Sequence, residues 1–331
     1  KMRSVAKGGS RVAIVMNGSP LFTGDANGGE SEIRRHIFEN DLLETLVAVP
    51  EQIFYNTGIA TYIWILTNRK PEHRKGKVQL IDASGEGFWK PMRKSLGDKR
   101  RKMDEGHISK VLEAYHAFEE DTDVSKIYPN EYFGYRKVTV DRPLQINLQT
   151  SAERMAQLEL EKQFTKLDAE DQTRYKNMFA SLPNKLYTSR NEFETDLMAQ
   201  AKASGLKIAA PLKKAIIKAL SERDDSAEVC KDKKGNPEAD SNLRDTERVP
   251  LDVDIDDYMS IEVLPHVPDA WVNESKAGCD KTSGEVGKVG YEINFNRYFY
   301  TYTPPRPLEE IEAEILGLQT QINDLMGQLF D

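Results

Sequence analysis

The chain has 331 residues, of which 39% are hydrophobic, and it carries a formal net charge of -8. This length and composition predict a soluble globular protein with room for two domains. No apolar run reaches the roughly 18 residues of a membrane span, and the first ten residues lack the apolar core of an export signal. The two cysteines, Cys230 and Cys279, form no Cys-x-x-Cys pair. We therefore expect a reduced, cytoplasmic protein with no membrane partner.

Charge is spread unevenly along the chain. Residues 69–102 contain 12 basic and four acidic residues, whereas residues 222–257 contain 13 acidic and six basic ones. The basic stretch predicts a surface that faces phosphate, because neutralising phosphates releases counterions and drives binding whatever the net charge. A merely solvated loop face is the alternative. The predicted contacts to a DNA backbone are Lys90, Arg93, Lys94, Lys99, Arg100, Arg101 and Lys102.

The first hundred residues alternate strand and helix signals, which is the pattern of an α/β sheet domain. Residues 11–16 form a nearly continuous apolar run and predict a buried strand. Residues 30–40 place Ile33 and Ile37 four apart among charges and predict an amphipathic helix. Three further strands are expected at 42–49, 60–67 and 77–83. Because the chain starts within a helix-to-strand connection, we expect an incomplete sheet that needs a preceding part of the gene product.

Beyond residue 104 the pattern becomes helical. Helices are predicted at 107–120, 150–166, 170–182 and 190–203, and Thr150 and Glu153 have capping-box spacing. Residues 222–248 contain almost no large apolar side chains and predict a solvated loop, and 271–290 is a second loop candidate. An aromatic cluster then follows, made of Phe295, Tyr298, Phe299, Tyr300 and Tyr302.

The last helix carries apolar residues at alternating intervals of three and four, which is the pattern of a heptad seam. Its members are Leu308, Ile311, Ile315, Leu318, Ile322, Leu325 and Leu329. The segment Pro304–Pro307 cannot form helix interior and would project the helix away from the aromatic cluster. The seam could pack on a partner or back on the helices of this chain.

No catalytic or metal-binding motif is present. The five histidines have no metal-ligand spacing, so no metal site is predicted. There is no nucleophile elbow, phosphate-binding loop or dinucleotide-binding glycine motif. The glycine-rich residues 24–29 predict a mobile loop before a helix. Motifs alone assign no reaction.

Three long stretches carry a family resemblance. The string from Gly8 to Lys70 resembles the segment that follows the catalytic tetrapeptide in modification subunits of bacterial type I restriction-modification systems. Residues 248–271 and 289–315 resemble the C-terminal region of the same family, and 128–144 extends the likeness. These subunits are N6-adenine DNA methyltransferases, so the resemblance identifies the chain as the C-terminal portion of one.

The resemblance implies an α/β fold in which residues 1–104 are the C-terminal part of a methyltransferase-type, Rossmann-like sheet. A mainly α-helical C-terminal domain is expected to follow, with a helical region at 105–220, an acidic solvated loop at 221–248, an aromatic-rich region at 249–303 and an assembly helix at 304–331. The implied reaction transfers a methyl group from S-adenosylmethionine to N6 of adenine in DNA. The implied partners are DNA, a specificity subunit bound by the heptad seam, a restriction subunit and a second modification subunit.

The family binds its cofactor at a glycine-rich turn and the target adenine at an Asn/Asp-Pro-Pro-Phe/Tyr tetrapeptide, and this sequence contains neither. We therefore expect no catalytic or cofactor-binding residue in this chain and no methyl transfer by it alone. By resemblance, Phe54 matches the phenylalanine that stacks on a flipped adenine, with Tyr55 beside it. The alternative is that both residues simply pack a loop against the sheet. For Arg34 and Arg35, solvation of the helix is preferred over phosphate contact.

Two other functions stay open. The first is a non-enzymatic assembly module that docks the specificity subunit and DNA. The second, an RNA or protein methyltransferase, is disfavoured by the strings specific to type I subunits.

Overall fold

The computed structural model describes residues 9–120, 123–302 and 304–330, and the side chains of 327–330 lie outside that description. The first eight residues, which bear on the export-signal prediction, also lie outside it. The chain divides into two compact units. One comprises 1–22, 40–129 and 293–331, and the other comprises 23–39 and 130–292. The units therefore cut across the linear boundaries expected from the sequence.

The first unit contains a five-stranded sheet in the order β1-β3-β2-β4-β7. Its strands are β1 (Arg11–Asn17), β2 (Leu43–Val49), β3 (Thr61–Thr67), β4 (Lys77–Asp82) and β7 (Ser125–Pro129). The four strands predicted in this region are confirmed, and β7 was not predicted. Because β1 and β2 both pair antiparallel with β3, and β4 pairs parallel with β2, strands β1, β2 and β4 run in one direction.

The prediction that the first strand is buried is wrong. Among the described residues, strand β1 pairs only with β3 and lies at the edge of the sheet, where Ile14 and Val15 are exposed. A continuous apolar run indicates burial on both faces only when both faces are covered. Strand β2 meets that condition, since all seven of its residues are buried.

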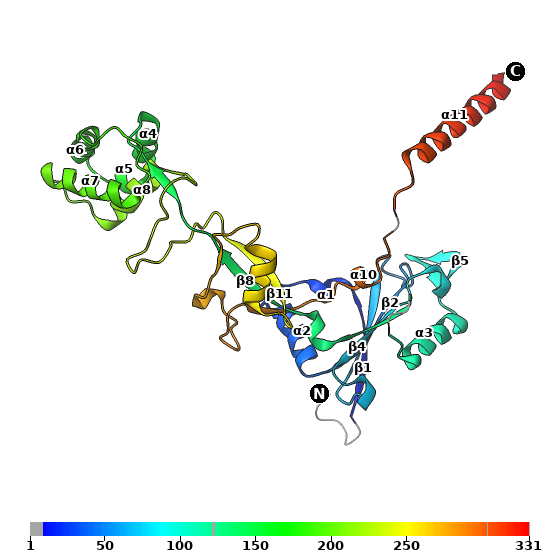
Figure 1. Cartoon of the computed structure of the whole chain (residues 1–331). Helices are drawn as coiled ribbons and strands as arrows, with labels where there is room; N and C mark the ends of the chain where they lie inside the picture. Colours follow the sequence, from blue (N-terminus) through cyan, green and yellow to red (C-terminus); the bar gives the residue numbers. More distant parts are fainter. Residues whose placement is uncertain (1–8, 121–122, 303, 331) are drawn as a thin grey trace. The chain divides into compact units, whose positions relative to one another are not determined.

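Helix α3 (Glu105–Ala117) covers one face of the sheet (Figure 1). It begins at Asp104, whose carboxylate accepts from the backbone N–H of His107, and ends at Phe118 in the left-handed conformation. Its apolar side packs on a cluster that includes Val47, Val49 and Ile81. The C-terminal segment with α10 (Phe295–Tyr298) packs on the opposite face, where Phe295 meets Tyr62.

In the second unit, β8 (Gly134–Asp141) is the central strand. It pairs antiparallel with β11 (Asp245–Pro250), with β12 (Trp271–Val272) and with β13 (Lys288–Tyr291). A short helix α9 (Ile255–Tyr258) and a π-helical turn at Met259–Val263 pack on Val140. These strands show that the candidate loop at 271–290 contains regular pairing.

Helix α2 (Gly29–Glu39) belongs to the second unit, and its inward face is polar as well as aromatic. The buried residues are Ser31, Arg34, Arg35 and Phe38, whereas Ile33 is exposed. The prediction that Ile33 marks the apolar face is therefore wrong. Polar groups can occupy the buried face because each finds a partner: the side chain of Ser31, for example, accepts from the backbone N–H of Tyr291.

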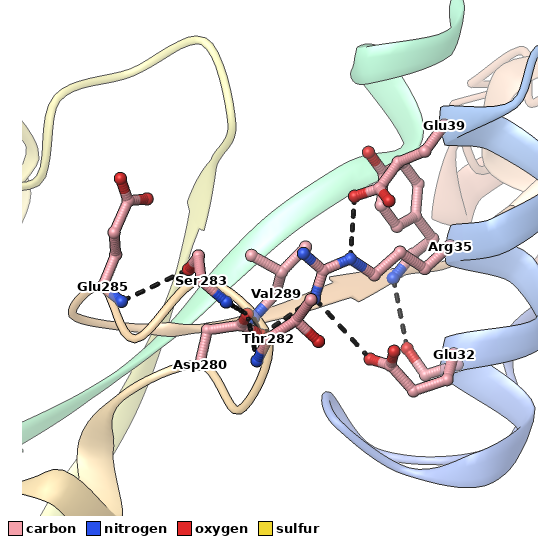
Figure 2. Close-up of polar contacts among 10 residues, drawn as sticks. Glu32, Arg35, Glu39, Asp280, Thr282, Ser283, Glu285 and Val289 are labelled. Atoms are coloured by element: carbon pink, nitrogen blue, oxygen red, sulfur yellow. Dashed lines mark hydrogen bonds and ion pairs between the residues drawn. The ribbon is translucent and has the colours of Figure 1, made fainter.

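Arg35 contacts a tight turn from the distant C-terminal region (Figure 2). Its guanidinium lies 2.9 Å from a carboxylate oxygen of Asp280 and 2.7 Å from one of Glu39. The Asp280 carboxylate also accepts from the backbone N–H groups of Thr282, Ser283 and Val289. This network fixes α2 to the turn.

The second unit also contains five helices with a separate apolar core (Figure 1). They are α4 (Ala152–Leu160), α5 (Lys162–Thr165), α6 (Ala169–Ala180), α7 (Arg190–Ala203) and α8 (Ala210–Leu220). The predicted helices in this region are confirmed, although α8 was not predicted and the first helix is capped by Ser151 rather than Thr150. The short strands β9 (Ile146–Leu148) and β10 (Ser221–Arg223) pair beside them. Within the expected helical region 105–220, strands β7, β8 and β9 separate α3 from the helices that follow residue 151.

The segment expected to be a solvated acidic loop is only partly so. Ala227, Cys230 and Asp240 are buried, and the backbone N–H of Cys230 donates to the carbonyl of Leu144 at 2.8 Å. Small and polar residues can be buried here because backbone pairing satisfies their polar groups. A composition poor in large apolar residues does not reveal such pairing.

Candidate functional site

The carboxyl ends of β1, β2 and β4 lie along one edge of the sheet in the first unit, at Asn17, Val49 and Asp82. Open α/β sheets bind their ligands at this edge. The loop that follows β2 carries Phe54 and Tyr55. The candidate aromatic residues therefore lie where such a sheet would present a ligand site.

Phe54 and Tyr55 have different surroundings. Phe54 is partly buried against the cluster under α3 and forms an isolated bridge with Thr57. Tyr55 is 62% exposed, and the ammonium of Lys99 lies 5.0 Å from the centre of its ring. In this structure Phe54 packs against the cluster under α3, while Tyr55 has the open aromatic face.

Residues 90–102 of the basic stretch form a hairpin, whereas their sequence predicted only a charged run. Strand β5 (Lys90–Leu96) pairs with β6 (Lys99–Lys102), and Gly97 in the turn has a φ of 63°. That left-handed conformation favours glycine, and a Cβ there would lie 2.5 Å from the carbonyl oxygen of Tyr55. The turn thus needs glycine for both its conformation and its close approach to the aromatic loop.

Backbone hydrogen bonds tie this hairpin to the aromatic loop. The N–H of Asp98 donates to the carbonyl of Tyr55 at 3.0 Å. The N–H groups of Arg100 and Arg101 both donate to the carbonyl of Gln52, at 3.0 and 3.2 Å. Gln52 has a φ of 59°, a strained conformation for a residue with a side chain. The aromatic loop and the basic hairpin consequently form one continuous structure.

The seven residues predicted to contact a DNA backbone do not have equivalent surroundings. Lys90 forms an ion pair with Asp104, and this contact together with the N–H of His107 holds the pKa of the Asp104 carboxyl well below its usual range. The guanidinium of Arg101 lies 3.9 Å from the ring centre of Trp89. Within the part of the chain that the structure describes, four exposed cations of the hairpin have no ion-pair partner: Arg93, Lys94, Arg100 and Lys102.

If the hairpin contacts a DNA backbone, as its sequence predicts, these four cations should determine the salt dependence of that binding. Replacing Arg93, Lys94 and Arg100 by glutamine should flatten the slope of log K against log salt by about 0.9 for each phosphate that is no longer neutralised. The matched control is Lys90→Gln, whose charge is already paired with Asp104 and which should change the slope little. The measurement is a fluorescence titration with duplex DNA at several salt concentrations. An unchanged slope in the triple variant would mean that the hairpin is only solvated.

Arg34 and Arg35 do not solvate the outer side of their helix, so the preferred interpretation of these residues is wrong. Both are buried. Arg34 donates to the backbone carbonyl of Tyr291, and at 2.8 Å to that of Thr23. Burial lowers the pKa of Arg34, whereas Glu39 and Asp280 outweigh burial and raise that of Arg35. Neither residue presents a cation to solvent.

The glycine-rich residues 24–29 do not fit a cofactor-binding turn. The N–H of Gly28 is used within the turn, where it donates to the carbonyl of Asp25 at 2.8 Å. The N–H of Asn27 donates to the carbonyl of Val289, and Lys137 binds the carboxylate of Asp25 at 2.8 Å. A ligand with a phosphate or carboxylate group would need backbone N–H groups that point toward it and are not already bonded within the protein. These bonds also fix a loop that was expected to be mobile.

The C-terminal helix α11 (Leu308–Phe330) presents the predicted seam as an exposed face. The side chain of Leu329 lies outside the described residues, and Ile311 is half-buried. The exposed members are Leu308, Ile315, Leu318, Ile322 and Leu325. In the aromatic cluster, Phe295 is buried, while Tyr300 and Tyr302 are exposed.

Sequence reasoning missed a second group of residues at the carboxyl edge. Phe22 ends the short helix α1 (Ser19–Phe22), and Tyr62 lies near the start of β3. Together with residues of the 293–297 segment they line a cavity of about 350 Å³. The sequence signal that could have indicated this cavity was the phenylalanine that follows the first strand. The described residues contain no cluster of three or more potential metal ligands, and none of their helices is long and apolar enough to cross a membrane.

Residues 1–135, which include all five strands of the sheet, match the N-6 DNA Methylase family. The N-terminal part of the chain is thus similar to the N-6 DNA Methylase family. More particularly, it is similar to methylase subunits of type I restriction enzymes. It is 35% identical over 132 residues to the MjaIX methylase subunit of Methanocaldococcus jannaschii, covering 40% of this chain and 22% of that protein. It is 34% identical over 111 residues to the HindI methylase subunit of Haemophilus influenzae, covering 34% and 23%.

The resemblance to type I modification subunits is confirmed by these matches. The chain spans about a fifth of the length of these curated relatives. Among solved structures, the type I methyltransferase subunit from Streptococcus thermophilus is 28% identical, with a TM-score of 0.32 over 37% of this chain and 24% of that one. A modification subunit of a putative type I restriction enzyme from Vibrio vulnificus is 18% identical, with a TM-score of 0.28 over 37% and 23%. The chain itself is a mixed α/β protein.

Proposed function

We propose that this chain is part of the modification subunit of a type I restriction-modification system. The full subunit would transfer a methyl group from S-adenosylmethionine to N6 of adenine in DNA. The observation that carries this proposal is the family match over residues 1–135, which include the carboxyl edge of the sheet, the aromatic loop and the basic hairpin. The sheet would then be the C-terminal part of a methyltransferase sheet.

Within that subunit, this chain would supply the aromatic side chain that stacks on the target base. A base turned out of the duplex loses its stacking, and an aromatic side chain can replace it. Our candidate for this aromatic side chain is Phe54, which the resemblance suggests, and Tyr55 is its more exposed neighbour. The adjoining hairpin cations would contact the DNA backbone. The sequence contains neither the catalytic tetrapeptide nor the cofactor turn, so the chain alone should transfer no methyl group.

The proposed stacking role can be separated from packing by two variants of Phe54. In the reconstituted enzyme, Phe54→Leu keeps apolar volume against the cluster under α3 but removes the aromatic face. Losing one base-aromatic stack costs about 1–3 kcal/mol, so methyl transfer should fall roughly ten- to a hundredfold. Phe54→Tyr should retain activity, and neither variant should disturb assembly. The measurement is the rate of incorporation of labelled methyl groups into duplex DNA.

Wild-type turnover by Phe54→Leu would contradict the assignment. If Tyr55→Ala is slow while Phe54→Leu is normal, the stacking residue is Tyr55 instead. If both leucine and tyrosine at position 54 lower the melting temperature and the rate together, Phe54 acts only by packing its loop.

Assembly supplies the second candidate function. The exposed seam of α11 favours a module that docks a specificity subunit, and for this chain docking and participation in the methyltransferase are compatible. The further proposed partners are DNA, the restriction subunit and a second modification subunit. Calorimetry separates the roles, since S-adenosylmethionine should bind the full-length subunit and leave this chain unbound. Cofactor binding by the chain alone would overturn its assignment as a non-catalytic portion.

A further inference from the structure

The cavity at the carboxyl edge has the walls of a site for a planar, partly polar group. One wall is α1 with Tyr62 of β3, and the other is the segment 293–297. The backbone N–H of Ile293 donates to the carbonyl of Leu21 at 2.8 Å, which joins the two walls. At about 350 Å³, the cavity lies at the lower end of the size range of small-ligand pockets.

Aromatic rings form much of the cavity's surface. Tyr62 and Phe295 make an edge-to-face contact with ring centres 5.2 Å apart, and Phe295 stacks on Phe299 at 5.0 Å. These contacts fix the two rings. Phe22, in contrast, is 54% exposed at the mouth. An exposed ring beside fixed rings offers a stacking surface for a flat ligand.

Polar side chains lie beside this aromatic surface. The phenol of Tyr62 lies 3.4 Å from the side-chain oxygen of Asn296. Burial, and then the nearby carboxylates of Asp82 and Glu51, raises the pKa of Tyr62. The side-chain amide of Asn296, which lines the cavity, can both donate to and accept from the polar edge of a base. Arg297 is exposed at the rim, and no ion pair joins it to another described residue.

We propose that this cavity binds an unpaired nucleobase of a DNA strand, with the base against Phe22 and its phosphate near Arg297. The inference rests on the proposed function, because only an enzyme that opens DNA would meet such a base. The base in this cavity would be a different one from the target adenine, which is proposed to stack on the loop of Phe54. Successive strand residues point to opposite faces, so Tyr62 lies on one face of the sheet, whereas Ile63 packs with Phe54 on the other.

The test measures binding of a short fluorescein-labelled single-stranded oligonucleotide to the whole chain. Phe22→Ala should weaken binding about ten- to a hundredfold, as expected for the loss of one base-aromatic stack. Phe22→Trp should restore it. Tyr300→Ala is the matched control, because Tyr300 is a 72% exposed aromatic that does not line the cavity. Arg297→Gln should lower the slope of log K against log salt by about 0.7, the value for one phosphate of a single strand.

A second measurement uses 2-aminopurine placed within the oligonucleotide. Its fluorescence should be quenched on binding to the wild type and much less so on binding to Phe22→Ala. Equal binding and quenching by Phe22→Ala and Tyr300→Ala would overturn the proposal. So would a Phe22→Ala variant that binds DNA normally but no longer co-purifies with the specificity subunit, since the cavity would then hold a protein side chain.

Methyl transfer by the assembled enzyme distinguishes this inference from the proposed function. If the assembled enzyme methylates adenine with the same KM for DNA in the wild type and in Phe22→Ala, the cavity proposal alone fails. If oligonucleotide binding depends on Phe22 but the assembled enzyme methylates no adenine, the cavity is a nucleobase site and the proposed function fails.

Discussion

Replacing Asp280 by alanine should lower the free energy of unfolding by about 3–5 kcal/mol, the cost of leaving a buried charge without its partner. The carboxylate of Asp280 is fully buried, and the Arg35 side chain is only 10% exposed. Alanine would remove one acceptor from the guanidinium and the side-chain acceptor of the Thr282 and Ser283 N–H groups (Figure 2). Urea denaturation followed by circular dichroism measures the change.

The matched control is Asp269→Ala. Asp269 also pairs with an arginine, Arg142, through two hydrogen bonds of 3.0 and 3.1 Å, but both side chains are about one-third exposed. Solvated pairs of this kind contribute about 0–1 kcal/mol. If the two variants lose equal stability, the network at Asp280 does not hold α2 in place. Glu39 remains near Arg35 in the Asp280 variant, so the loss should lie toward the lower end of the range.

The same carboxylate makes stability depend on pH in the acid range. Burial by itself raises the pKa of Asp280, but the N–H groups of Ser283, Thr282 and Val289 and the Arg35 guanidinium outweigh it and hold the pKa below its ordinary value. The unfolded chain therefore binds a proton first, at a pH near the ordinary value of about 3.9. The contribution of Asp280 is complete above that pH and disappears as pH falls through the lower folded value. Asp280→Asn should reduce this acid dependence.

Local sequence patterns predicted the central elements of the first unit well. Strand β2 is a short, mostly apolar run with β-branched residues that ends before Pro50, and β3 is a run of β-branched and aromatic residues that ends before Asn68. Such runs can be recognised from the local sequence alone. Helix α7 begins and ends at the predicted residues, 190 and 203. The exposure of β1 was missed because burial depends on which neighbours cover a strand.

The roles of Arg34 and Arg35 could not be predicted from their own helix. Arg34 donates to Tyr291, 257 positions away, and Arg35 pairs with Asp280, 245 positions away. Amphipathic patterning assumes that charged residues face solvent, and it fails where distant groups satisfy them.

The candidate site was only partly visible for the same reason. Charge composition located the basic stretch, but composition could not show that its N–H groups bind the carbonyl of Gln52, or that Lys90 is paired. Phe22 and Tyr62 lie 40 positions apart in the sequence, and no motif links them. Their proximity arises from the antiparallel pairing of β1 with β3.

Substituting aspartate for both Ile315 and Ile322 should abolish co-purification of the chain with the specificity subunit. A strict 3.5-residue repeat over three heptads is what a helix needs to lie along another helix, and a carboxylate within such a seam loses its hydration without gaining a partner. Both isoleucines are 57% exposed in this chain. The melting temperature of the chain alone should therefore barely change, because the substitutions remove little buried surface.

Ala313→Asp with Thr320→Asp is the matched control, since these positions add the same charge to the same helix on the side away from the seam. This variant should still co-purify. If it also fails to co-purify, charge rather than the seam opposes assembly. A large loss of thermal stability in Ile315→Asp with Ile322→Asp, with assembly intact, would instead show that the seam packs on this chain's own helices.

Gly317 provides a further check, because a Cβ there meets no atom within 4 Å. Gly317→Ala should stabilise the isolated helix by about 1 kcal/mol and strengthen assembly if the helix must be ordered to bind.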